Sequence, residues 1–104
     1  MSPVTEAAYS LYLVRCNDGS LYTGIATDVA RRLKEHADSR RGAKFLRGKA
    51  PLILVFEREL GDRSVATRVE HQVKKLPRHE KADTSILSAR IDDVLASIES
   101  ASKE

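Results

Sequence analysis

The strongest constraint on the fold is a predicted β-hairpin in the first quarter of the chain. Residues Tyr9–Cys16 (YSLYLVRC) are rich in β-forming side chains and predict a strand. The Asn-Asp-Gly sequence at 17–19 is a turn signal, because these residue types tolerate the backbone conformations of tight hairpins. Leu21–Thr23 predicts the second strand of the hairpin, which ends at Gly24. Such a hairpin requires a core built around a small antiparallel sheet.

Apolar spacing predicts the remaining elements. The unbroken apolar run over 51–56 predicts a strand that is buried on both faces. Residues 42–48 are expected to form a loop or a single helical turn. The resulting order, β-β-α-β-α-α, is an α+β fold with a small three-stranded antiparallel sheet flanked by helices. The predicted helices run from a cap at Thr27 or Asp28 to Ala37, from Gly61 or Asp62 to a stop at Pro77, and over 81–97.

The composition and the charge distribution limit the possible functions. With 104 residues, of which 41% are hydrophobic and 32% charged, the chain is expected to form one small soluble domain. Residues 28–49 carry eight basic and three acidic side chains, a surplus of +5, although the whole chain has a net charge of only +3. Residues 82–104 carry five acidic and two basic side chains, or −3. We therefore expect a surface that binds anions on the first segment and an acidic tail facing away from it.

We expect a cytoplasmic location. A single cysteine, Cys16, cannot form an intramolecular disulfide, which is typical of a reducing compartment. The N-terminus lacks the basic and apolar segments of a signal peptide, and the run over 52–56 is too short to cross a bilayer. Three histidines and one cysteine without paired spacing argue against structural zinc.

Five side chains are candidates for a common site. Tyr12 and Tyr22 lie an even number of positions apart across the turn, so both phenols share one face if the register allows it. Arg32 and His36 are four residues apart and therefore lie on one side of their predicted helix. Glu70 lies near the apolar stripe of the next helix, where a carboxylate should be partly buried. Phosphate-binding loops and the common zinc-hydrolase, serine-hydrolase and CxxC motifs are absent.

At these positions the sequence resembles the GIY-YIG nuclease domain. The segment SLY at 10–12 lies about ten residues before YTG at 22–24 and is similar to the paired motif of that family. The resemblance covers residues 8–81, with 82–104 as a C-terminal helix and tail that pack on or extend the same domain. The chain is most similar to small bacterial single-domain members, which in turn resemble the nuclease domain of structure-selective endonucleases that cut branched DNA.

The resemblance implies a role for each candidate. Glu70 matches the acidic residue that holds a single divalent metal, and a carboxylate with several waters suits Mg²⁺ or Mn²⁺. Arg32 matches the arginine whose guanidinium binds phosphate oxygens. Tyr12 matches the tyrosine that activates or orients the attacking water, and Tyr22 matches its partner. His36 matches a histidine that is a proton carrier, a phosphate contact or a surface residue.

The resemblance also extends to the basic loop. Lys44, Arg47 and Lys49 are expected to follow the nucleic-acid backbone, because backbone contacts need charge but no sequence code. Gly24 is explained by backbone geometry or by close approach of substrate. Ile25 replaces a lysine found in some repair-nuclease relatives, so the role of that lysine has no counterpart here.

The same residues have ordinary structural interpretations. Glu70 could be a helix carboxylate paired with Arg68 or Lys74. Arg32 could lie on a solvated helix face, and the two tyrosines could be half-buried strand residues. The basic loop could be a solvated surface.

The resemblance therefore implies a Mg²⁺-dependent endonuclease that hydrolyses DNA phosphodiester bonds, as in DNA repair. Branched or single-stranded DNA would be selected by shape rather than by sequence. The main alternative is a non-catalytic nucleic-acid-binding module with the same fold. A third possibility is a protein-interaction module that uses the acidic C-terminal helix.

Overall fold

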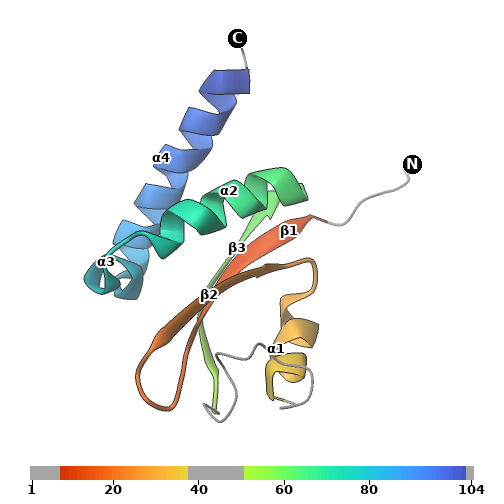
Figure 1. Cartoon of the computed structure of the whole chain (residues 1–104), viewed down its shortest axis with the longest axis vertical. Helices are drawn as coiled ribbons and strands as arrows, with labels where there is room; N and C mark the ends of the chain where they lie inside the picture. The colour runs from red at the N-terminus through yellow and green to blue at the C-terminus, as the bar shows by residue number, and fades with distance from the viewer. Residues whose placement is uncertain (1–7, 38–50, 103–104) are drawn as a thin grey trace.

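The predicted hairpin forms one side of a three-stranded antiparallel sheet (Figure 1). The computed structural model describes residues 8–37 and 51–102. The sheet order β2-β1-β3 places β1 in the centre, paired with both neighbours. The predicted α+β class is confirmed. The elements are β1 (Tyr9–Arg15), β2 (Leu21–Ala26), α1 (Val29–Ala37), β3 (Ile53–Gly61), α2 (Arg63–Lys74), α3 (Arg78–Ala82) and α4 (Thr84–Ser102).

Side chains on the central strand alternate between two cores. Leu11 and Leu13 are fully buried in a cluster with apolar residues of α2 and α4. Tyr12 and Val14 point to the other face, where they join Val29 of α1. The sheet therefore separates a larger core under α2 and α4 from a smaller core under α1. The candidate tyrosine Tyr12 belongs to the smaller core.

The third strand differs from its prediction in length and in burial. It begins at Ile53 and continues to Gly61, and the side chains of Ile53 and Leu54 are 48% and 39% exposed. The prediction of a strand buried on both faces is therefore wrong. Within the described residues β3 is an edge strand, paired only with β1, and a register shift near Leu13 and Val14 interrupts its alternation. The polar second half of the strand was missed because it lacks a continuous apolar run.

Aspartates define where the helices begin. The Asp28 carboxylate accepts a hydrogen bond from the Arg31 amide at 3.1 Å, which selects Asp28 over Thr27 as the cap of α1. Asp62 caps α2 in the same way. Asp83 accepts from the amides of residues 85 and 86 and so starts α4. The predicted last helix is present as α4, but it begins at Thr84 rather than at 81 and continues to Ser102, because Asp83 separates it from the short α3.

The C-terminal helix α4 is attached to the rest of the domain by both apolar and polar contacts. Its residues Leu87 and Ile91 are fully buried against the sheet and α2. On its other side, the Arg58 guanidinium of β3 donates to the Ser88 carbonyl and contacts the Asp92 carboxylate at 2.7 Å. Among the helices of the described segments, none is long and apolar enough to cross a membrane.

We predict that Leu87→Ala destabilises the fold far more than Leu54→Ala. Leu87 is fully buried between α4 and the sheet, so its truncation should leave a cavity and cost about 2–5 kcal/mol. Leu54 is 39% exposed, and the same truncation there should cost less than about 1 kcal/mol. Urea unfolding followed by circular dichroism measures both values. Equal losses would show that α4 does not contribute to the core.

Candidate active site

The two predicted tyrosines share one face of the hairpin. The β1–β2 register places Tyr12 opposite Gly24 and Tyr22 opposite Val14, so the two phenols are diagonal neighbours. Their ring centroids are 6.4 Å apart. The expectation that both phenols share a face is confirmed.

Gly24 leaves the space that the Tyr12 ring occupies. A Cβ atom built at position 24 would lie 2.5 Å from the Tyr12 hydroxyl oxygen and 2.6 Å from Cζ. Only Gly19 and Gly61 have positive φ among the described residues, so an unusual backbone conformation does not explain this glycine. The group that packs closely against Gly24 is therefore the ring of Tyr12.

His36 forms the third member of this aromatic group. Its Nε2 atom lies 2.8 Å from the Tyr12 hydroxyl oxygen, and its ring meets the edge of Tyr22 at a centroid distance of 5.6 Å. The residue is only 3% exposed, so the interpretation of His36 as a surface residue is wrong. Burial, and secondly the charge of Arg32, hold its pKa below the ordinary 6.5. The imidazole is therefore neutral at neutral pH and can accept the phenol proton.

The Tyr12 phenol is strongly held in its protonated form. Burial raises the pKa of Tyr12 to about 12, with Tyr22 and Glu70 also raising it and Arg32 lowering it. At pH 7 only about one molecule in 10⁵ would carry the phenolate. A base mechanism that starts from ionised Tyr12 is therefore unfavourable. The charge of Arg32 on α1 opposes the effect of burial by lowering the pKa, while the charge of Glu70 on α2 is the smallest of the contributions that raise it.

Arg32 is oriented by a carboxylate on its own helix. Its Nη1 donates to Glu35 Oε1 at 2.9 Å, while Arg31 Nε lies 3.4 Å from the other carboxylate oxygen. The hydrogen bond from Arg32 is the main reason that the pKa of Glu35 is lowered. The Arg32 side chain is still 41% exposed. Sequence reasoning missed Glu35, although its i,i+3 spacing from Arg32 was a usable signal.

Glu70 pairs with a lysine of α2. Its Oε2 lies 3.2 Å from Lys74 Nζ, so the lysine pairing considered from the sequence is present. The Glu70 side chain is 20% exposed, in agreement with the predicted partial burial. The carboxylate is therefore accessible to solvent while it acts on the buried Tyr12.

The five candidates form one group with a buried floor and a more exposed rim. The floor consists of Tyr12 and His36, which are 1% and 3% exposed. The rim consists of Tyr22, Arg32 and Glu70, which are all partly exposed. The fold thus brings together side chains from β1, β2, α1 and α2. The basic residues Lys44, Arg47 and Lys49 lie outside the described residues.

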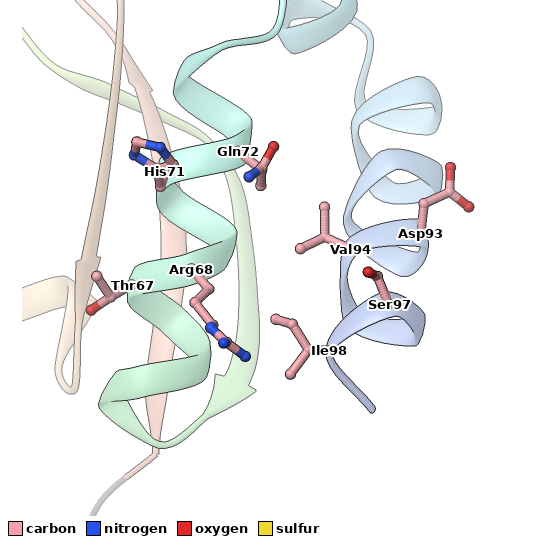
Figure 2. A pocket seen from close by; sticks show the side chains of 8 residues that line it. All are labelled: Thr67, Arg68, His71, Gln72, Asp93, Val94, Ser97 and Ile98. Carbon is pink, nitrogen blue, oxygen red and sulfur yellow. The ribbon is translucent and has the colours of Figure 1, made fainter. Parts of the chain in front are cut away.

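Two hollows lie near the elements that carry the site. One, of about 210 Å³, adjoins Arg32 between α1 and the ends of β1 and β2. The other, of about 610 Å³, lies between α2 and α4 (Figure 2). Its walls include Arg68 and His71 of α2 and Val94 and Ile98 of α4. None of the five candidates lines this second hollow.

Comparison with known proteins identifies the family. The GIY-YIG catalytic domain matches residues 8–83. The chain belongs to the GIY-YIG family. A UPF0213 protein of Yersinia enterocolitica is 51% identical over 78 residues, which cover 75% of this chain and 79% of that protein. A UPF0213 protein of Yersinia pestis is 48% identical over 88 residues, covering 85% and 92%. The resemblance drawn from the two half-motifs is confirmed.

A solved structure agrees with this assignment. The solution NMR structure of a protein from E. faecalis is 37% identical, covers 73% of this chain and 80% of its own, and has a TM-score of 0.52. The chain is thus one of the small bacterial single-domain GIY-YIG proteins. The function associated with the GIY-YIG domain is of the nuclease type.

GIY-YIG nucleases typically use a divalent metal, and one side chain of the site suits such an ion. Residues 8–37 and 51–102 contain no group of three or more His, Cys, Asp or Glu side chains that could enclose a metal. Glu70 offers a single hard carboxylate that is partly exposed. That donor fits an ion such as Mg²⁺, which keeps most of its waters and takes one or two carboxylates from the protein.

We predict that Gly24→Ala displaces the Tyr12 ring. The added methyl group would overlap the phenol, and the resulting strain should cost about 1–3 kcal/mol. In a Tyr12→Ala background the overlap is absent, so Gly24→Ala should then cost much less. A double-mutant cycle by urea unfolding measures this coupling. Additive losses would mean that the ring does not depend on the glycine.

We predict that His36 makes the fold less stable as the pH falls below 6.5. Burial lowers its pKa in the folded state, so the unfolded chain takes up the proton first and is favoured by acid. Replacing the histidine in His36→Gln should reduce the loss of unfolding free energy between pH 7 and pH 5. The exposed His71→Gln is the matched control and should keep the wild-type pH dependence. Identical profiles for all three proteins would contradict a buried neutral His36.

Proposed function

We propose that this protein is a Mg²⁺-dependent endonuclease that hydrolyses DNA phosphodiester bonds. The observation that carries the proposal is the contact of Tyr12, Tyr22 and His36 beside Arg32, to which we add Glu70 of α2. They come from four elements of a chain that belongs to a nuclease family. Phosphodiester hydrolysis needs an oriented water, a positive charge at the phosphate and help for the leaving oxygen. These five side chains can supply each requirement.

Substrate reaches the site from the rim. Arg32 and Glu70 keep 41% and 20% of their side-chain surface exposed, and Tyr22 on β2 is half-buried. The floor residues, by contrast, are almost fully buried. The rim therefore binds the phosphate, and the floor acts on the attacking water through the Tyr12 hydroxyl.

Tyr12 orients the water while it remains protonated. Its hydroxyl oxygen lies 2.8 Å from His36 Nε2; when the ring proton of His36 is on Nδ1, the hydroxyl donates to Nε2 and its lone pairs can accept a hydrogen bond from a water. As the water attacks phosphorus, its proton can pass to the Tyr12 oxygen while the phenol proton passes to His36 Nε2. This transfer needs no free phenolate, in agreement with the pKa of about 12. His36 thus acts as proton carrier rather than as phosphate contact.

Arg32 and Glu70 compensate the negative charge of the phosphate, the first directly and the second through the metal that it would hold. The bond to Glu35 fixes the orientation of the Arg32 guanidinium, whose remaining donors suit two phosphate oxygens. Glu70 would hold the Mg²⁺ ion, which supplies Lewis-acid stabilisation of the phosphate charge when bound. The charges of Arg32 and Glu70 influence the Tyr12 phenol in opposite directions, which supports a shared site.

The site contacts the phosphate backbone of the DNA rather than the edges of its bases. Its rim consists of a cation, a carboxylate and a phenol, none arranged as a code for base pairs. We therefore propose selection by DNA shape, with branched or single-stranded DNA as the substrate class. The location we propose is the cytoplasm, where the buried thiol of Cys16 stays reduced.

We predict that cleavage needs Mg²⁺, Glu70 and Arg32. Labelled duplex, single-stranded and branched DNA are incubated with Mg²⁺ or with chelator, and products are separated on denaturing gels. Glu70→Ala and Arg32→Ala should each lower the cleavage rate by about 10²–10³, because each removes charge stabilisation of the transition state. DNA binding should largely survive in Glu70→Ala.

Matched controls test the two assignments separately. Arg31→Ala removes the neighbouring arginine, which also contacts Glu35, and should leave the rate in the same order of magnitude. Glu99→Gln removes an exposed carboxylate of α4 and should have no effect. Full activity of Glu70→Ala would overturn the metal assignment. If the wild type binds DNA with a steep salt dependence and never cuts it, the non-catalytic binding module is the correct function.

A further inference from the structure

Basic side chains continue past the rim at the end of α2. Lys74 contacts Glu70, Lys75 follows as the cap of α2, and Arg78 begins α3. All three are exposed. We call these three residues the α2–α3 corner. In the sequence they lie outside residues 28–49, so the basic surplus counted for that segment does not include them.

A hydrogen bond places this corner beside the hairpin that carries the tyrosines. The Arg78 guanidinium donates to the Gly19 carbonyl in the β1–β2 turn. Lys74, at the other side of the corner, is held next to the rim by its 3.2 Å contact with Glu70. The corner therefore spans from the rim to the tip of the hairpin, along the α2 side of the edge strand β2.

An ordinary explanation exists for part of this charge. Cations in the last turn of a helix stabilise its partial negative end, which applies to Lys74 and Lys75. It does not apply to Arg78, which lies in the first turn of α3, where the helix dipole disfavours a cation. The Arg78 guanidinium instead donates to the Gly19 carbonyl in the hairpin turn. Helix stabilisation alone therefore does not account for the corner.

We propose that the α2–α3 corner binds the nucleic-acid backbone on the side of the site opposite α1. The inference rests on the proposed function and extends it. Lys74 lies against the Glu70 carboxylate and Arg78 is bonded to the hairpin turn, so a strand that runs from Glu70 toward the tip of the hairpin passes these cations. Beyond Glu70, the next side chains along that path are Lys74, Lys75 and Arg78. Phosphates that flank the cleaved one bind there.

Lys74 also links backbone binding to metal binding. Its ammonium lies 3.2 Å from the Glu70 carboxylate that would hold a divalent cation. A cation at Glu70 would compete with this ion pair and would leave the charge of Lys74 available to a phosphate.

The first test measures binding without cleavage. The affinity for a labelled single-stranded oligonucleotide is determined in chelator between about 50 and 200 mM salt, the range in which counterion release is visible. Lys75→Ala and Arg78→Ala should each reduce the slope of log affinity against log salt by about 0.7, the value for one lost contact to a single strand. Arg68→Ala is the matched control, because Arg68 lines the hollow between α2 and α4, and it should leave the slope unchanged.

A conservative variant separates charge from structure. Arg78→Lys keeps the charge but loses the guanidinium geometry at the Gly19 carbonyl, and it should keep the wild-type slope. If Arg78→Lys and Arg78→Ala reduce the salt slope equally, Arg78 acts only by stabilising the hairpin turn, and the proposal is overturned. Equal losses in Arg68→Ala would also overturn it, because they would indicate diffuse attraction.

The second test measures the metal alone. Mn²⁺ binding, followed by electron paramagnetic resonance, should be about two- to fivefold tighter in Lys74→Ala, the gain expected when one exposed ion pair stops competing. Glu70→Ala should abolish this binding. Unchanged Mn²⁺ affinity in Lys74→Ala would overturn the link between Lys74 and the metal.

Failure of the corner and failure of the proposed function give different results. If the wild type cuts DNA but the corner variants keep the full salt slope, the endonuclease proposal stands and the corner proposal is overturned. If the slopes fall as expected but no DNA is cut, the corner is supported and the endonuclease activity is overturned.

Discussion

The hydrogen bond between Tyr12 and His36 is the interaction on which the site depends. It joins the central strand β1 to helix α1 inside the smaller core, at an oxygen-to-nitrogen distance of 2.8 Å. The bond is possible only because Gly24 on β2 has no side chain where the phenol ring lies. Three elements are thus fixed relative to one another by one aromatic ring and one imidazole. Arg32, one turn before His36 on the same helix, is placed as a consequence.

Burial of this pair determines the chemistry that it can perform. Desolvation raises the pKa of Tyr12 to about 12 and lowers that of His36, so both groups are neutral at neutral pH. Charged side chains are confined to the rim, where Arg32 and Glu70 retain contact with water. A neutral floor can hold and relay a proton without attracting the phosphate itself. The negative substrate is then positioned by the rim alone.

The sequence predicted the grouping of the site better than its surroundings. The even offset of Tyr12 and Tyr22 and the i,i+4 spacing of Arg32 and His36 are local rules that tertiary packing did not change. Burial was harder to predict, because it depends on which elements cover each face. The apolar run over 51–56 was predicted to be buried on both faces, but β3 lies at an edge of the described sheet. A surface position was one interpretation of His36, but the rings of Tyr12 and Tyr22 pack against it. A single aspartate, Asp83, was enough to divide the last predicted helix.

The acidic end of the chain shows why net charge describes this protein poorly. Asp92 is bound by Arg58 of β3, and Asp93 lies 3.8 Å from Arg90 on its own helix. Arg90 in turn contacts Glu80 of α3 at 3.1 Å. Two of these ion pairs attach α4 to β3 and to α3, so Asp92 and Arg90 have structural roles. An anion approaching the rim responds to the local cations rather than to the total of +3.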